Sequence, residues 1–277
     1  MTASDTSFNG DSDDIIAVAH LLADAARAAI LPYFRTGCLT TENKLAPGAM
    51  GDGGFDPVTA ADRAAERAMR DILARRRPED GILGEEFGSS DGTSGLTWVL
   101  DPIDGTRGFI AGTPTWGVLI AAVTAQGPVY GLIDQPYIGE RFEGGFGRAH
   151  MIGPLGQRSL LAGSDRPLGA ATVMTTFPAV GTPAEGAAFA EVAAQAQIVR
   201  YGCDCYAYAL LALGQVDLVI EAGLNAHDIC APIAVIEAAG GIVTDWQGGS
   251  AANGGRIVAA ASAMQHDAAL RILAQVE

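Results

Sequence analysis

The sequence predicts an α/β (α+β) protein in which a hairpin-rich, antiparallel half precedes a half of alternating strands and helices. Three observations carry this prediction: helical periodicity near the N-terminus, closely spaced β-rich runs in the middle, and strand-helix alternation after about residue 168. The 277 residues suffice for one large domain or two closely packed halves. We expect an N-terminal half over 1–168 and a C-terminal half over 169–277.

Two amphipathic helices are expected in the first half. Apolar residues between positions 15 and 30 recur at three- and four-residue intervals, which is the spacing of one helix face. Thr59 precedes Asp62 by three residues, a capping-box pattern that predicts the start of a helix over 60–76. Between these helices, the glycine-rich stretch 47–54 predicts a loop, either a surface linker or a lid over a site.

The strands are predicted from β-rich runs bounded by turn residues. In the first half these runs cover 81–84, 96–101, 117–124, 129–135 and 141–146. Their spacing of roughly 8–12 residues indicates hairpins in a mostly antiparallel sheet. In the second half, expected strands at 171–176, 198–201, 216–221, 241–245 and 257–260 alternate with expected helices at 183–196, 204–213, 228–239 and 264–276. Such alternation is typical of an α/β half.

Composition narrows the classes of function. The chain carries 17 Lys and Arg against 32 Asp and Glu, a formal charge of −15 that argues against nucleic-acid binding. We expect no basic leader and no apolar stretch that approaches the roughly 20 residues of a membrane span, and hence a cytoplasmic protein without a membrane partner. Cys38, Cys203, Cys205 and Cys230 lack paired spacing and are predicted to be reduced core residues.

The segment WVLDPIDGT is the most informative in the chain. It places Asp101 and Asp104 three apart where a buried strand is expected to end and a turn to begin. Pro102 fixes a backbone dihedral, Gly105 lets the main chain approach a ligand, and Thr106 can open a helix whose free N–H groups would suit a phosphate. Oxygen ligands gathered there would suit Mg²⁺. Alternatively, both acids are turn and N-cap residues.

Further acidic positions favour the metal site. Glu85 and Glu86 follow an expected strand, and adjacent carboxylates repel each other unless cations or solvent screen them. Asp228 precedes an apolar helix, although a lone acid in that place is more often an N-cap. An acidic protein that handles phosphate must neutralise it locally, and a divalent cation held by carboxylates is the simplest way.

Three blocks carry a resemblance to a known family. GEE ending at Glu86, DPIDGT ending at Thr106, and HD ending at Asp228 followed by EAAGG stand in the order found in the inositol monophosphatase-like superfamily. The sequence is similar to this superfamily over residues 56–248. The resemblance implies a layered αβαβα sandwich of the inositol monophosphatase/fructose-1,6-bisphosphatase type, with metals between its two halves, and a homodimer.

The resemblance also implies a set of metal ligands. Carried over residue by residue, Glu85, Asp101 and the carbonyl of Ile103 would hold one Mg²⁺. Asp101, Asp104 and Asp228 would hold a second, and Glu85 would position a third through water. Two or three Mg²⁺ per active site are therefore expected.

The catalytic and phosphate-binding residues follow from the same likeness. Asp62 and Thr106 match the pair that orients the nucleophilic water, with Glu85 acting beside them. The backbone amides of Gly105 and Thr106 would receive phosphate oxygens. The reaction implied is in-line attack of an activated water on a phosphate monoester, without an enzyme nucleophile.

The segments around the substrate residues are similar to the histidinol-phosphatase branch, which implies hydrolysis of L-histidinol phosphate in histidine biosynthesis. Asp204 and Glu221 would face the ammonium and imidazole of this substrate, and Arg107 would contact it. Alternatively, Asp204 only caps the helix that follows it, and Arg107 only forms an ion pair on the surface. Glu221 also resembles an acid that binds sugar hydroxyls in the wider superfamily. His227 stands where an aromatic residue is common and is interpreted as packing like one.

Two other functions stay open. The first is an inositol-1-monophosphatase or a broader sugar-phosphate phosphatase on the same scaffold. The second is a catalytically silent homologue that only binds metal or phosphate. A silent homologue is expected to have lost a metal ligand or a water-orienting residue, and every such position keeps its acid or threonine.

Overall fold

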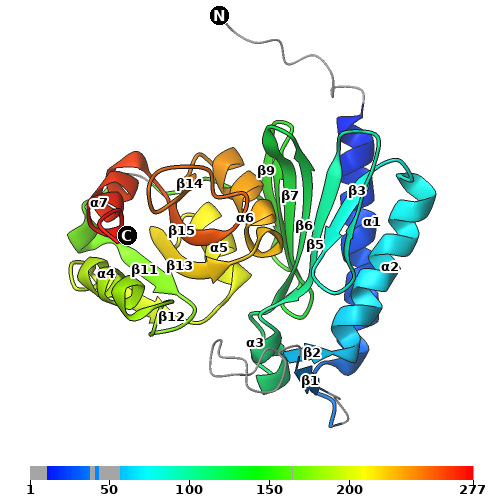
Figure 1. Ribbon diagram of the computed structural model, residues 1–277, viewed down its shortest axis with the longest axis horizontal. Helices are drawn as coiled ribbons and strands as arrows, with labels where there is room; N and C mark the ends of the chain where they lie inside the picture. The colour runs from blue at the N-terminus through cyan, green and yellow to red at the C-terminus, as the bar shows by residue number, and fades with distance from the viewer. Residues whose placement is uncertain (1–10, 38–40, 44–56, 164, 277) are drawn as a thin grey trace, which may run out of the picture.

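Two β-sheets alternate with three layers of helices in the computed structural model, which describes residues 11–37, 41–43, 57–163 and 165–276 (Figure 1). Helices α1 (Ser12–Ile30) and α2 (Ala60–Arg76) cover one face of the larger sheet. Helices α5 (Cys205–Ala212) and α6 (Ala226–Ala238) fill the space between the sheets, and α4 (Pro183–Ala193) and α7 (Ala263–Leu273) cover the far side. The predicted αβαβα sandwich is confirmed.

The larger sheet has eight strands in the order β10-β9-β8-β7-β6-β5-β3-β4. Its neighbours pair antiparallel except β3 and β5, so the prediction of a mostly antiparallel sheet is confirmed. The strands are β3 (Gly81–Gly84), β4 (Gly88–Ser90), β5 (Thr97–Asp104), β6 (Gly117–Thr124), β7 (Gly127–Gln135), β8 (Glu140–Gly145), β9 (Arg148–Gly153) and β10 (Gly156–Ser159). A separate pair joins β1 (Thr41–Asn43) to β2 (Pro57–Thr59).

The smaller sheet has five strands in the order β12-β11-β13-β15-β14. Its central strand β13 is parallel to β11 and antiparallel to β15. The strands are β11 (Thr172–Thr175), β12 (Ile198–Tyr201), β13 (Leu218–Leu224), β14 (Ile242–Asp245) and β15 (Gly255–Ala260). Each lies where the sequence predicts a strand, with ends shifted by a few residues.

Helix α6 is the element that joins the two sheets. It is buried almost all round over residues 229–236, because one side meets the larger sheet and the other meets α5 and β14. Two glycines of the larger sheet permit this packing. A Cβ on Gly131 would lie 2.3 Å from the carbonyl oxygen of Ala231, and one on Gly144 would lie 2.5 Å from the Cα of Val235. The larger sheet therefore packs directly against the backbone of α6, which fixes the distance between the helix and the sheet.

Strand β5 runs further than the sequence predicts. It continues through Pro102 to Asp104, whereas the predicted strand ends at Asp101. The pairing with β6 shifts register between Asp101 and Asp104, since Pro102 has no N–H to donate. The turn begins only at Gly105, whose φ of 85° is left-handed. The helix expected to open at Thr106 is α3 (Thr106–Ala111).

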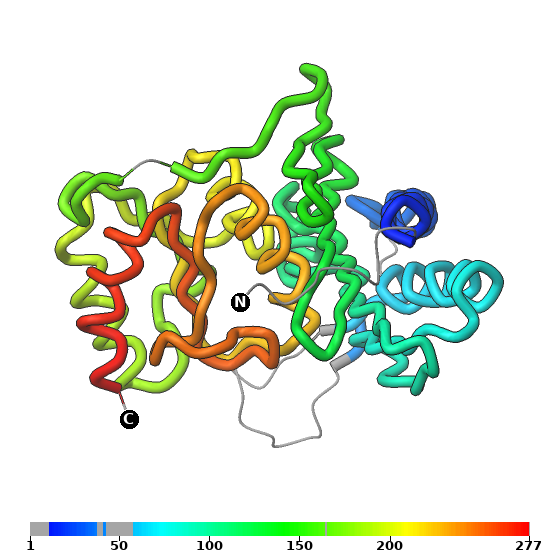
Figure 2. The backbone as a smooth tube through the Cα atoms, turned by 90° about the horizontal axis from the view of Figure 1, so that it is seen from above, coloured from blue at the N-terminus to red at the C-terminus, as the bar shows by residue number. Residues whose placement is uncertain are grey.

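Five strands were not predicted: β1, β2, β4, β9 and β10. All are short or polar, and every residue of β4 and β10 is exposed, so they carry no apolar alternation. In the view from above, the β9–β10 hairpin extends well beyond the layers (Figure 2). Cys38 and the predicted loop 47–54 lie outside the described residues. Cys205 and Cys230 are buried and free, as expected, whereas Cys203 is half-buried.

The segment Ser12–Tyr33 is long and apolar enough, by length and composition alone, to cross a membrane. In the fold it belongs to the core. Ile15, Val18 and Leu22 are fully buried in the cluster that α1 forms with α2 and the larger sheet. Arg27 of the same helix pairs with the buried Asp134 of β7 in the larger sheet. These contacts are those of a core helix that covers a sheet.

Candidate functional site

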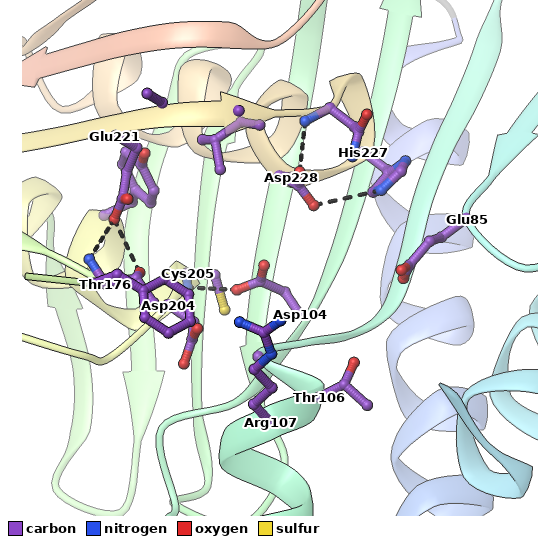
Figure 3. Close-up of a pocket in the computed structure, with 17 residues that line it drawn as sticks. Glu85, Asp104, Thr106, Arg107, Thr176, Asp204, Cys205, Glu221, His227 and Asp228 are labelled. Atoms are coloured by element: carbon purple, nitrogen blue, oxygen red, sulfur yellow. Dashed lines mark hydrogen bonds and ion pairs between the residues drawn. The ribbon is translucent and has the colours of Figure 1, made fainter. Parts of the chain in front are cut away.

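Three aspartates meet where β5 of the larger sheet faces the start of α6. One carboxylate oxygen from each of Asp101, Asp104 and Asp228 lies within 4.8 Å of the others. A second group of ligand atoms within the same distance comes from Glu85, Asp101 and His227. Figure 3 shows Asp104 and Asp228 in the middle of the pocket, with Glu85 beyond His227 on one side. The structure thus brings together the four acids that the sequence assigns to metal.

Backbone amides orient the two acids of β5. The amide of Ile103 donates to Oδ1 of Asp101 over 3.0 Å. The amide of Cys205, the first residue of α5, donates to Oδ2 of Asp104 over 2.5 Å. Each bond fixes one carboxylate oxygen, so the orientation of the other is set as well. Because α5 belongs to the layer between the sheets, the position of Asp104 depends on the packing of that layer.

Asp62 and Asp228 are both held at the third position of a helix. The amide of Thr59 donates to Oδ2 of Asp62 over 2.9 Å, and the amide of Asn225 donates to Oδ2 of Asp228 over 2.6 Å. Asn225 is therefore the N-cap of α6, and the alternative that Asp228 is an N-cap is wrong. The second oxygen of Asp228 lies 3.5 Å from Nε2 of His227.

The aspartate cluster carries negative charge that the described residues do not neutralise. Burial, reinforced by the neighbouring carboxylates, raises the pKa of Asp101 and Asp104 well above its usual value. Burial also raises the pKa of Asp228, against the opposing effect of His227. None of the three pairs with an arginine or lysine among the residues described. The three carboxylates fit a hard divalent cation, whereas the group with His227 adds a nitrogen, a donor that also suits softer metals.

Thr106 connects the metal ligands to Asp62. Its Oγ1 lies 3.0 Å from the carbonyl oxygen of Ile103 and 3.5 Å from Oδ1 of Asp62, so its single proton can be donated to either oxygen. Asp62 is fully buried, and burial raises its pKa although Thr59 hydrogen bonds oppose the shift. The geometry therefore pairs Thr106 at the pocket wall with a buried acid that accepts protons more readily than an exposed aspartate.

Asp204 faces the turn after β5. It stands at the N-cap position of α5, but its carboxylate makes no capping hydrogen bond. A Cβ on Gly105 would lie 2.8 Å from the carboxyl carbon of Asp204, so only glycine fits beneath it. Burial raises the pKa of Asp204 to about 6, although Arg107 opposes the shift. The carboxylate of Asp204 therefore lines the pocket and does not cap its own helix.

Glu221 lies on the wall opposite Glu85, beside Thr176 and Asp204 (Figure 3). Its Oε1 accepts from the amide of Thr176 over 2.7 Å and from the hydroxyl of Thr176 over 2.9 Å. Burial nevertheless raises its pKa to about 7. Arg107 lines the same pocket, and its guanidinium carbon lies 5.1 Å from the centre of the Phe177 ring.

A comparison with known families decides the assignment. The profile of the inositol monophosphatase family matches residues 11–277. The chain belongs to the inositol monophosphatase family. Members of this family are metal-dependent phosphatases that act on small phosphate esters, and the aspartate cluster is of the kind that such chemistry requires.

Individual relatives within the inositol monophosphatase family carry different names. The chain is 41% identical over 244 residues to "Bifunctional phosphatase IMPL2, chloroplastic" of Arabidopsis thaliana, covering 85% of this chain but only 65% of that longer protein. It is 34% identical to a histidinol-phosphatase of Mycobacterium tuberculosis, covering 94% of this chain and 97% of that one. It is 38% identical to the solved inositol monophosphatase of Zymomonas mobilis, with a TM-score of 0.82 and coverage of 95% and 99%. These identities support the family and not one substrate.

Several pocket residues were not predicted. His227 is interpreted from sequence as packing like an aromatic ring, but one of its ring nitrogens and carboxylate oxygens of Glu85 and Asp101 lie within 4.8 Å of one another. Thr176 and Tyr208 also line the pocket. A signal for Thr176 exists, because it follows β11, which pairs in parallel with the strand that carries Glu221, and parallel strands end at the same edge of a sheet. Tyr208 has no such signal, since a helical tyrosine is usually a core residue.

Proposed function

We propose that the protein is a Mg²⁺-dependent histidinol-phosphate phosphatase that converts L-histidinol phosphate and water to L-histidinol and phosphate. The observation that carries the proposal is the cluster of Asp101, Asp104 and Asp228, of which Asp104 and Asp228 line one cavity of about 270 Å³ together with Asp204 and Glu221. The first group suits a cation and a phosphate, and the second suits the cationic end of a substrate.

Glu85, Asp101 and the carbonyl of Ile103 would hold one Mg²⁺, and Asp101, Asp104 and Asp228 would hold another. When bound, such cations neutralise phosphate charge and lower the pKa of water. The raised pKa values of Asp101 and Asp104 support this assignment, because a cation replaces the protons that these carboxyls otherwise retain. Glu85 would also position a third cation through water, as the resemblance to the family implies.

Asp62 and Thr106 would orient the attacking water. The Thr106 hydroxyl can accept a hydrogen bond from this water while it donates its own proton toward Oδ1 of Asp62, 3.5 Å away. Burial raises the pKa of Asp62, which makes its carboxylate a better acceptor at neutral pH. Amides of Gly105 and Thr106 would bind the phosphate oxygens, since the left-handed Gly105 brings the main chain to the pocket.

Asp204, Glu221 and Arg107 would bind the alcohol part of the substrate. Burial raises the pKa of Asp204 to about 6 and that of Glu221 to about 7 in the empty pocket. An ammonium or imidazolium placed between them would lower both values, so these acids favour a cationic substrate over a neutral one.

The test is a side-by-side measurement of kcat/KM for histidinol phosphate and inositol 1-phosphate with Mg²⁺. We expect histidinol phosphate to be preferred at least about tenfold, equivalent to one lost charge contact. Asp204→Asn should reduce turnover of histidinol phosphate much more than that of inositol 1-phosphate, which is neutral outside its phosphate. A clear preference of the wild-type enzyme for inositol 1-phosphate would refute the substrate assignment and leave the phosphatase in place.

Inositol-1-monophosphatase activity is the second candidate. It is supported by the 38% identity to the Zymomonas mobilis structure and by the three hydrogen bonds that hold Glu221 in an orientation suited to hydroxyl groups. The same kinetic comparison separates the two candidates.

The proposal includes a cytoplasmic homodimer. Its support is the family resemblance together with the exposed side chains of Ile152, Leu155 and Leu161, on and after the β9–β10 hairpin. Light scattering coupled to gel filtration should give a mass of two chains. Leu155→Asp should shift that mass toward a single chain if the hairpin lies in the contact.

A further inference from the structure

Tyr208 on α5 has a buried hydroxyl without a hydrogen-bond partner. The side chain is 3% exposed and lines the same pocket as Asp104, Glu221 and Asp228. Its hydroxyl makes no hydrogen bond to any residue that the structure describes. A buried hydroxyl left in this state destabilises the folded protein, so proteins normally either pair such a group or replace it with phenylalanine.

Other tyrosines of the fold show that the chain pairs its phenols where it can. The hydroxyl of Tyr130, buried in the larger sheet, donates to Oε2 of Glu143 over 2.6 Å. Tyr206, two residues before Tyr208 on the same helix, donates to Oε2 of Glu140 over 2.8 Å. Tyr208 differs from both in being a residue of the pocket lining. A molecule bound in the pocket is therefore the candidate for its missing partner.

The groups around Tyr208 indicate which part of a bound substrate its hydroxyl would contact. Among the charged groups that act on its hydroxyl, Glu221 has the strongest effect, ahead of Asp104 and Asp228. Glu221 lies on the wall assigned to the alcohol and not to the phosphate. Burial and these acids also raise the pKa of Tyr208, so the phenol keeps its proton and can donate it in a hydrogen bond.

We propose that the Tyr208 hydroxyl donates a hydrogen bond to an acceptor atom on the alcohol part of the substrate and so determines specificity. This inference rests on the proposed phosphatase function. Once Asp204 and Glu221 are ionised they can only accept hydrogen bonds, so a substrate hydroxyl oxygen or ring nitrogen then needs a neutral donor beside them. Both a polyol and an imidazole offer such an acceptor, and a leaving group without one gains nothing from Tyr208.

The experiment compares Tyr208→Phe with the wild-type enzyme on three esters in the presence of Mg²⁺: histidinol phosphate, inositol 1-phosphate and phenyl phosphate. We expect kcat/KM to fall about 10- to 100-fold for whichever of the first two the wild type prefers, because the pocket loses a hydrogen bond made to the substrate. For phenyl phosphate, whose leaving group carries no further acceptor, the fall should not exceed about twofold.

Thermal unfolding of the same variants separates a binding role from a structural one. Without substrate, Tyr208→Phe should raise Tm by about 2–4 °C, because it removes an unpaired buried hydroxyl. The matched control Tyr130→Phe should lower Tm, since it breaks a bond to Glu143, and should leave kcat/KM unchanged on every ester.

Three outcomes would overturn the assignment of Tyr208: an equal loss on all esters, no loss on any, or a lower Tm for Tyr208→Phe. The failure of the proposed function looks different. In that case the wild-type enzyme with Mg²⁺ would hydrolyse none of the three esters, and the phosphatase and the role of Tyr208 would be rejected together.

Discussion

Two regions of the protein treat their buried carboxylates in opposite ways. Between α1 and the larger sheet, the fully buried Asp134 pairs with Arg27 at 2.7 Å and with Arg141 at 2.8 Å. Between the two sheets, Asp101 is almost as deeply buried, yet its neighbours are Glu85 and further aspartates. The same side chain is thus neutralised by arginine in one region and crowded by like charges in the other.

The pKa values report the same contrast. Burial tends to raise the pKa of Glu143 beside Asp134, but hydrogen bonds from His20 and Tyr130 outweigh burial and leave it lowered. At the site, burial and like charges together raise the pKa of Asp101. Uncompensated buried charge destabilises a fold unless something arrives to pair with it. The arginine pairs therefore stabilise the fold in the first region, whereas we propose that the aspartate cluster in the second receives a cation.

The largest expected effect is that of Asp101→Asn. Asp101 belongs to both groups of candidate ligands, so its loss should weaken both cation positions. We expect kcat to fall about 10³-fold or more, equivalent to about 4 kcal/mol of transition-state stabilisation. Tm in metal-free buffer should stay the same or rise, since a neutral amide replaces a buried group that is unfavourable when charged. Turnover within tenfold of the wild type would remove Asp101 from the metal site.

The matched change in the structural cluster is Asp134→Asn. Asparagine keeps the shape but leaves Arg27 and Arg141 without their shared carboxylate, so we expect the free energy of unfolding to drop by about 3–5 kcal/mol. Urea denaturation followed by circular dichroism measures this drop. Phosphatase activity per folded molecule should stay within about twofold, because Asp134 lies outside the pocket. Loss of activity without loss of stability would contradict the division between the two clusters.

Much of the fold could be predicted because its signals are local. The apolar spacing of α1, the Thr59 and Asp62 pair that opens α2, and the strand-helix alternation of the second half depend only on neighbours in sequence. The extension of β5 through Pro102 could not be predicted, because a bulge depends on the partner strand β6. The exposed strands β4 and β10 were missed since their backbones pair without any buried face.

The candidate site also has a part that could be predicted from local motifs and a part that depends on tertiary packing. The meeting of Glu85, Asp101, Asp104 and Asp228 could be predicted because short motifs with a known order carry them. The position of His227 and the unpaired hydroxyl of Tyr208 could not, since both depend on which side of a helix faces the pocket. The pairing of Asp134 with arginine could not be predicted either, because Arg27 lies 107 residues away in sequence.

Magnesium should stabilise the protein through one cluster only. At free Mg²⁺ of about 100 times Kd, binding adds about 2.7 kcal/mol to the free energy of unfolding. We expect a corresponding rise in the Tm of the wild type that disappears with chelator and is absent in Asp101→Asn. Asp134→Asn should unfold at a lower temperature but keep the full magnesium-induced rise. An equal rise in both variants would place the cation away from the aspartate cluster.

The smallest expected effect is a difference in pH dependence, measured by urea unfolding between pH 3 and 8 in metal-free buffer. The folded-state pKa of Glu221, about 7, lies above its usual 4.5, so its contribution to stability is full below 4.5 and is lost as pH rises through 7. Glu143 has a lowered pKa, so its contribution is present above 4.5 and is lost as pH falls through its folded value. Glu221→Gln should therefore remove about 1–3 kcal/mol of the decline in unfolding free energy as the pH rises toward neutral. Glu143→Gln should reduce only the loss of unfolding free energy at acid pH. The same decline in unfolding free energy between pH 4.5 and 7 in Glu221→Gln and the wild type would contradict the raised pKa of Glu221. The contrast between this pocket wall and the arginine-paired cluster would then fail.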